Sequence, residues 1–217
     1  KIALRRVIAM GYDAAESLRV LQKGRGVLAQ SLVPPGIAGY DPDWKLGAQV
    51  HDPAAARALL DRFGYLDRDG DGFRELPDGK PLVLERWSVP TSGQHEADEL
   101  WTKNMTAIGI RLAIRKDKLP ELRKMARHGK IPFRSDGWNA DYPDAENFMQ
   151  FLYGPNAGQE NQSRFRLAEY DRLYDEARRL PDGRERNALF GRMQTLMAAY
   201  APMRLTQHII EDRAWHA

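Results

Sequence analysis

The segment Pro81–Ile114, PLVLERWSVPTSGQHEADELWTKNMTAIGIRLAI, changes its hydrophobic period twice. Residues 82–85 alternate as a strand does, residues 97–108 carry apolar side chains at helical spacing, and residues 110–114 alternate again. This order predicts a β-α-β unit. Its two strands are expected to lie parallel in one sheet and to be joined by a right-handed crossover.

Helical patterns dominate on both sides of this unit. Upstream, residues 2–10 form one predicted helix, Asp13 caps a second that ends near Gly24, and Asp52-Pro53 opens a third that Gly64 closes. The remaining predicted elements are an extended loop over 26–40 around Pro34-Pro35-Gly36, helices over 120–128, 145–152, 167–179 and 182–200, and strands over 131–138 and 203–210. The predicted fold class is α/β (α+β): a mixed β-sheet flanked by helices, in a single domain over residues 1–217.

The composition excludes several classes of protein. The chain has 217 residues, of which 42% are hydrophobic and 29% charged, and it has no cysteine, which excludes disulfides, thiol nucleophiles and thiolate metal sites. Its 33 Lys and Arg are interspersed with 30 Asp and Glu, so no basic stripe for nucleic acid is expected. No run approaches the roughly 20 apolar residues of a membrane-spanning helix. Because Lys1–Arg6 has neither an initiator Met nor a secretory pattern, we expect the chain to be part of a longer protein.

One loop has the spacing of a calcium site. Its oxygen-bearing residues and the central glycine fall at positions 1, 3, 5, 6, 9 and 12 of a D-x-D-x-D-G loop: Asp67, Asp69, Asp71, Gly72, Glu75 and Asp78. Position 12 prefers a bidentate Glu, however, and the flanking elements are a helix and a strand. A polar turn between elements is therefore the favoured interpretation.

Motifs for other chemistries are incomplete. His95-Glu96 begins a zinc motif, but Glu99 stands where the second histidine belongs, so no metal site is predicted there. The glycines at 24 and 26 match a dinucleotide fingerprint only formally, because a helix precedes them and Pro34-Pro35 follows. No nucleophile elbow or P-loop occurs in the sequence.

The stretch Ser135–Ser163 contains no Lys or Arg and gathers aromatic and acidic residues. Carboxylates accept charge-assisted hydrogen bonds from an ammonium group, and aromatic faces favour cations. The stretch therefore indicates a site for an amine-bearing ligand, with an ordinary turn and helix cap as the alternative. A hydrolase or lyase that uses Asp141, Asp144 or Glu146 as acid and base is a less favoured interpretation.

Several segments, in chain order, are similar to one known protein family. Gly137–Phe148, GWNADYPDAENF, resembles a signature of the family 5 extracellular solute-binding proteins, the peptide, dipeptide and oligopeptide receptors of ABC importers. The other similar segments are Leu4–Asp13 (LRRVIAMGYD), Gly24–Gly36 ending in PPG, Asp52–Tyr65 (DPAAARALLDRFGY) and the polar turn Asp69–Leu82. The resemblance covers nearly the whole chain.

This resemblance implies the second lobe of a two-lobe periplasmic receptor, with the signal peptide and first lobe outside this chain. It maps the aspartate that grips a ligand's α-ammonium onto Asp141, a pocket tryptophan onto Trp138 and a variable pocket position onto Asn139. It implies a monomer that binds a peptide or other small amine-bearing ligand for an ABC permease, with no catalytic residue, metal or cofactor. Other members bind nickel chelates, haem, opines or sugars, so a non-peptide solute is the alternative.

Overall fold

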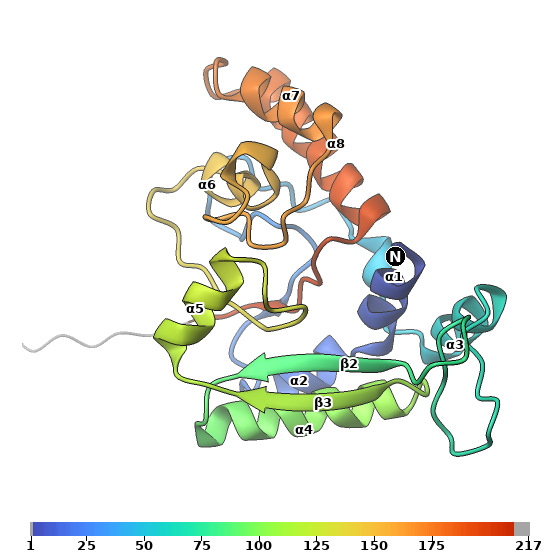
Figure 1. Ribbon diagram of the computed structural model, residues 1–217. Helices are drawn as coiled ribbons and strands as arrows, with labels where there is room; N and C mark the ends of the chain where they lie inside the picture. Colours follow the sequence, from blue (N-terminus) through green and yellow to red (C-terminus); the bar gives the residue numbers. More distant parts are fainter. Residues whose placement is uncertain (1, 211–217) are drawn as a thin grey trace, which may run out of the picture.

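The structure, a computed structural model, describes residues 2–210 and contains the predicted β-α-β unit (Figure 1). Strand β2 (Val83–Ser88) pairs in parallel with β3 (Arg111–Lys116), and helix α4 (Ser92–Thr106) connects them. Figure 1 shows α4 lying along one face of this strand pair. The hydroxyl of Thr91 caps the helix by accepting a hydrogen bond from the amide of Gln94 at 3.4 Å. The parallel pairing confirms the prediction, and both strands run past their predicted ends.

The helices before this unit also form as predicted. They are α1 (Ile2–Gly11), α2 (Ala14–Val20) and α3 (Pro53–Arg62). Asp13 and Asp52 cap α2 and α3, each accepting from the amide three residues on, and Gly64 ends α3 with a positive φ of 77°. These helices and the β-α-β unit bury one hydrophobic core, which includes Val7, Tyr12, Ala56, Leu60, Leu100, Trp101, Met105, Ile108 and Ile110.

A second core lies at the other end of the molecule, where Figure 1 shows α7 beside α8. The elements involved are α6 (Glu146–Met149), a short 3₁₀ turn Gln150–Leu152, α7 (Ala168–Ala177) and α8 (Arg184–Tyr200). Their fully buried side chains include Met149, Leu152, Tyr170, Leu173, Met193 and Met197. Gly39 lets the predicted loop over 26–40 reach this core, because an added Cβ would come within 2.7 Å of the Cβ of Ala145.

Polar contacts join the two cores. Arg5 and Arg6 of α1 donate hydrogen bonds to the carbonyls of Tyr200 and Ala199 at the end of α8, with distances of 2.7–3.2 Å. The buried side chain of Gln49, in the 3₁₀ turn Gly47–Gln49, accepts from the amide of Leu205 at 2.9 Å. Side chains and carbonyls on opposite elements therefore hold the two halves of the molecule together.

The strands differ from the single mixed sheet that we expected. The short strands β1 (Val27–Leu28) and β4 (Gln207–His208) pair antiparallel with each other, apart from the parallel pair β2–β3. The predicted strand over 131–138 is wrong except at Arg134, which forms a single bridge to Trp87. Pro132 has no amide to donate to a ladder, and residues 135–140 form no strand.

Helix α5 (Leu119–Arg127) and the 3₁₀ turn Gly154–Asn156 complete the elements of residues 2–210. None of the helices in this range is long and apolar enough to cross a membrane. The α/β class is confirmed, with two small sheets set among helices.

Candidate functional site

The aromatic and acidic stretch begins with an irregular segment, residues 135–144, which we call the binding segment. Just before it, the chain runs beside the carboxyl end of β2, where the amide of Trp87 donates to the carbonyl of Phe133 at 2.9 Å. The connection then leaves this strand and rises to α6 (Figure 1). The chain beyond the carboxyl end of a parallel strand is a common place for ligands in α/β proteins.

A single buried side chain orders the middle of the binding segment. Asn147 of α6 is 1% exposed. Its Oδ1 accepts from the indole Nε1 of Trp138 at 2.8 Å and from the amide of Asp141 at 3.1 Å. Its Nδ2 donates to Oδ2 of Asp141 at 3.1 Å. Asn147 therefore fixes the indole of Trp138 and the carboxylate of Asp141 together.

The surroundings of these side chains leave both open to a ligand. Trp138 is 41% exposed, and its ring packs edge-on against Phe151 with 5.1 Å between centroids. Asp141 is exposed and has no ion-pair partner within residues 2–210. Asn139 is also exposed, and its side chain makes no hydrogen bond in that range. The arrangement offers a carboxylate beside an aromatic surface.

Asp144 and Glu146 are engaged elsewhere. Both carboxylate oxygens of Asp144 accept from Arg186 of α8, one of them at 2.9 Å. Glu146 accepts hydrogen bonds from the hydroxyls of Tyr142 and Tyr174. Burial and the bond to Glu146 raise the pKa of both tyrosines, so their hydroxyls stay protonated donors. Within residues 2–210, the carboxylates of Asp144 and Glu146 are therefore bonded to other side chains and not to Asp141.

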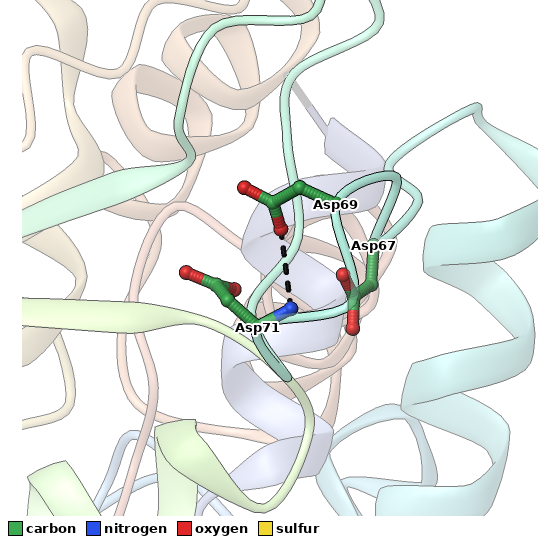
Figure 2. Close-up of side chains that lie close together, drawn as sticks. All are labelled: Asp67, Asp69 and Asp71. Carbon is green, nitrogen blue, oxygen red and sulfur yellow. Dashed lines mark hydrogen bonds between the residues drawn. The ribbon is translucent and has the colours of Figure 1, made fainter.

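In the acidic loop over residues 67–78, only three of the predicted calcium ligands lie close together (Figure 2). Carboxylate oxygens of Asp67, Asp69 and Asp71 lie within 4.8 Å of one another. However, Asp67 accepts from the amides of Gly70 and Gly72, and Asp71 accepts from Arg111 at 2.6 Å.

The later positions of the loop are bound to other partners. Glu75 accepts from the amide of Arg68 at 2.8 Å, and Asp78 accepts from Lys80 at 2.9 Å. Both contacts lie within residues 67–80 of the loop itself.

Sequence reasoning placed Trp138, Asn139 and Asp141 in the site but missed Asn147 and Phe151. Asn147 lies inside the quoted signature, in a helix whose neighbours Ala145, Phe148 and Met149 are apolar. A polar residue among buried neighbours usually has a hydrogen-bonding role. That signal marks Asn147 without naming its partners.

Comparisons with known proteins identify the family of this chain. A family model described as bacterial extracellular solute-binding proteins, family 5 middle, matches residues 1–160. Di/tripeptide-binding protein 1 of Pseudomonas aeruginosa is 26% identical over 226 residues, covering 96% of this chain and 39% of that protein. Heme-binding protein A of Haemophilus influenzae is 27% identical over 202 residues, covering 93% of this chain and 35% of that protein.

A solved structure has the same fold. The oligopeptide-binding protein of Bacillus subtilis, in complex with a nonapeptide, superposes with a TM-score of 0.86 at 17% identity, covering 96% of this chain and 42% of that one. The chain thus spans 39% and 35% of the length of the two curated relatives. Since the family model matches residues 1–160 of 217, the chain belongs to the bacterial extracellular solute-binding proteins of family 5.

Proposed function

We propose that this chain is one lobe, the second, of the substrate-binding component of an ABC importer. The complete receptor captures di- or oligopeptides between two lobes and delivers them to a membrane permease. The family to which the chain belongs, and the peptide-binding relatives that it resembles, support this proposal. We place the receptor in the periplasm, as a monomer.

One observation carries the peptide assignment. Asn147 holds the exposed Asp141 carboxylate beside the exposed indole of Trp138, and Asp141 has no cationic partner within residues 2–210. A carboxylate prepared in this way suits the α-ammonium of a peptide, because the hydrogen bond is charge-assisted and the aromatic face favours a cation.

Lobe closure explains how an exposed site can bind tightly. Asp141 faces water in this lobe, where an ion pair contributes about 0–1 kcal/mol. A second lobe closing over the ligand by hinge motion would exclude that water, and the charged hydrogen bond would then contribute roughly 1.5–3 kcal/mol. Asn139, exposed on the same segment, would contact ligand side chains.

Calorimetry on the complete receptor tests the proposal. Trialanine should bind, and N-acetyl-trialanine, which lacks the ammonium group, should bind more weakly. Asp141→Asn should weaken the binding of trialanine by about 2 kcal/mol, and it should abolish the difference in affinity between the two peptides. Asp136→Asn is the matched control: it removes the same charge from the same segment, but Asp136 pairs with Arg134, so affinity should not change. Unchanged affinity in Asp141→Asn would remove Asp141 from the site.

A non-peptide solute is the alternative. The likeness to heme-binding protein A keeps it open, because the name of that relative refers to a ligand without an α-ammonium group. Binding of haem that Asp141→Asn leaves unchanged, together with no binding of trialanine, would favour this alternative.

A further inference from the structure

A fully buried arginine lies beneath the start of the binding segment. Arg86 of β2 is 0% exposed. Its guanidinium lies 5.4 Å from the ring centroid of Trp101 and 5.4 Å from that of Phe133. The ring of Tyr12 stacks on the ring of Trp101, with 3.7 Å between their centroids. A charged side chain in such surroundings needs specific partners to offset its desolvation.

One set of partners belongs to the β-α-β unit itself. Nε of Arg86 donates to Oδ1 of Asp98 at 2.9 Å, and Asp98 is 3% exposed. The hydroxyl of Ser88 donates to Oδ2 of Asp98 at 2.6 Å, and Nζ of Lys116 lies 3.1 Å from the same oxygen. Burial lowers the pKa of Arg86, and the Asp98 carboxylate opposes that shift. This part of the network links β2, β3 and α4.

The remaining partner is outside the unit. Nη1 of Arg86 donates to Oγ of Ser135 at 3.1 Å, and Ser135 is the first residue of the binding segment. Nη2 is buried and has no hydrogen-bond partner within residues 2–210. One guanidinium nitrogen already lacks an acceptor, so loss of the Ser135 hydroxyl would leave Nη1 as a second nitrogen without one.

Backbone bonds hold both ends of the binding segment: Trp87 donates to the carbonyl of Phe133 just before it, and Ala38 donates to the carbonyl of Pro143 at 3.2 Å. Residues 135–140 form no helix or strand. At the carboxyl end of the segment, Asp144 accepts from Arg186 of α8, beside the second core. In the middle of the segment, Asn147 binds Trp138 and Asp141. The bond from Arg86 to Ser135 is the corresponding attachment to the first core. At each end of the segment that carries Trp138 and Asp141, an arginine side chain thus adds to the backbone bonds.

We propose that Arg86 is a positioning residue for ligand binding: through Ser135 it fixes where the binding segment leaves β2, and so where Trp138 and Asp141 present themselves. This inference rests on the proposed function of the segment as the ligand site. A merely structural Arg86–Asp98 pair would stabilise the β-α-β unit and would leave the binding segment unaffected.

Two matched serine variants separate these roles, because both remove one hydroxyl from the same network. Ser135→Ala removes the link to the binding segment, whereas Ser88→Ala removes a bond to Asp98 within the unit. In the complete protein, Ser135→Ala should bind trialanine about fivefold more weakly, and Ser88→Ala should bind it as the wild type does. Ser135→Thr, which keeps the hydroxyl, should restore affinity.

Hydrogen exchange gives a readout that needs no ligand. The amide of Asp141 donates to Asn147, so its exchange reports the order of the segment. The Asp141 amide should exchange several-fold faster in Ser135→Ala than in Ser88→Ala. Ser135→Ala should at the same time lose no more thermal stability than Ser88→Ala. Equal exchange and equal affinity in the two variants would overturn the proposal. If Asp141→Asn leaves trialanine binding intact while Ser135→Ala still speeds exchange, the proposed function fails and the positioning of the segment stands.

Discussion

At the scale of single residues, the site depends on one amide that binds two neighbours. Asn147 accepts from the indole of Trp138 and from the amide of Asp141 while donating to the Asp141 carboxylate. Both the oxygen and the nitrogen of the Asn147 side-chain amide therefore have a hydrogen-bond partner. This explains how an exposed segment without regular structure can present an aromatic ring and a carboxylate in a fixed relation.

Removing this amide should cost stability as well as order. We expect Asn147→Ala to lower the free energy of unfolding by about 2 kcal/mol, because three hydrogen bonds are lost at a position that is 1% exposed. Urea denaturation measures this change. Asn139→Ala, at an exposed position of the binding segment, should stay within about 0.5 kcal/mol of the wild type. Equal losses in the two variants would contradict the role given to Asn147.

The sequence could indicate Trp138 and Asp141 but not what holds them. Their types and the family signature are local properties that can be read directly. The bond from Asn147 back to Trp138 exists only because the chain turns between them, and the bond from Arg86 to Ser135 joins residues 49 apart. Contacts of this kind depend on tertiary structure, so no local pattern predicts them.

At the scale of elements, prediction succeeded where the period of the sequence was strong. The change from alternation to helical spacing and back correctly predicted β2, α4 and β3. The strand expected over 131–138 failed because a single bridge at Arg134 is all that forms. Strand β1 was missed because it has only two residues and pairs with β4, far along the chain. Pairing of such short strands depends on what the rest of the fold brings together.

The β1–β4 pair should respond to acid through His208. Burial lowers the pKa of His208 below its ordinary value of 6.5, and the ring donates a hydrogen bond to the carbonyl of Ser31 at 3.0 Å. The unfolded chain therefore binds this proton more tightly than the folded chain. Stability from the neutral ring is complete above pH 6.5 and is lost as the pH falls through and below that value.

Thermal unfolding between about pH 8 and about pH 5 measures this effect. His208→Gln keeps a donor toward Ser31 but does not titrate, so its melting temperature should fall less on acidification than that of the wild type. His95→Gln is the control, because His95 is exposed on α4, where its side chain is 65% accessible. If wild type and His208→Gln lose stability in parallel, His208 does not stay neutral in the folded protein.

At the scale of the whole molecule, two hydrophobic cores lie toward opposite ends, and the binding segment runs from one to the other. Phe133, just before the segment, packs against the first core, and Phe148, just after it, lies in the second. The geometry of the site therefore depends on how the cores are held together. Arg5 and Arg6 of α1 make part of that connection at the end of α8.

The double variant Arg5→Ala/Arg6→Ala tests this connection. It should lower the free energy of unfolding by about 1–2 kcal/mol, because carbonyls at the carboxyl end of α8 lose charged donors. Arg19→Ala removes an arginine whose side chain is 74% exposed, and it should change stability by less than about 0.5 kcal/mol. Chemical denaturation measures both. An unchanged double variant would mean that the two arginines do not contribute to joining the cores.

The central claim is that Asp141 anchors the ammonium group of a peptide in the complete receptor. Native mass spectrometry of the receptor, purified without added ligand, tests it most directly by weighing what the protein carries. We predict bound masses that correspond to short peptides in the wild type and their loss in Asp141→Ala. A bound mass that is not a peptide, and that survives the substitution, would contradict the claim.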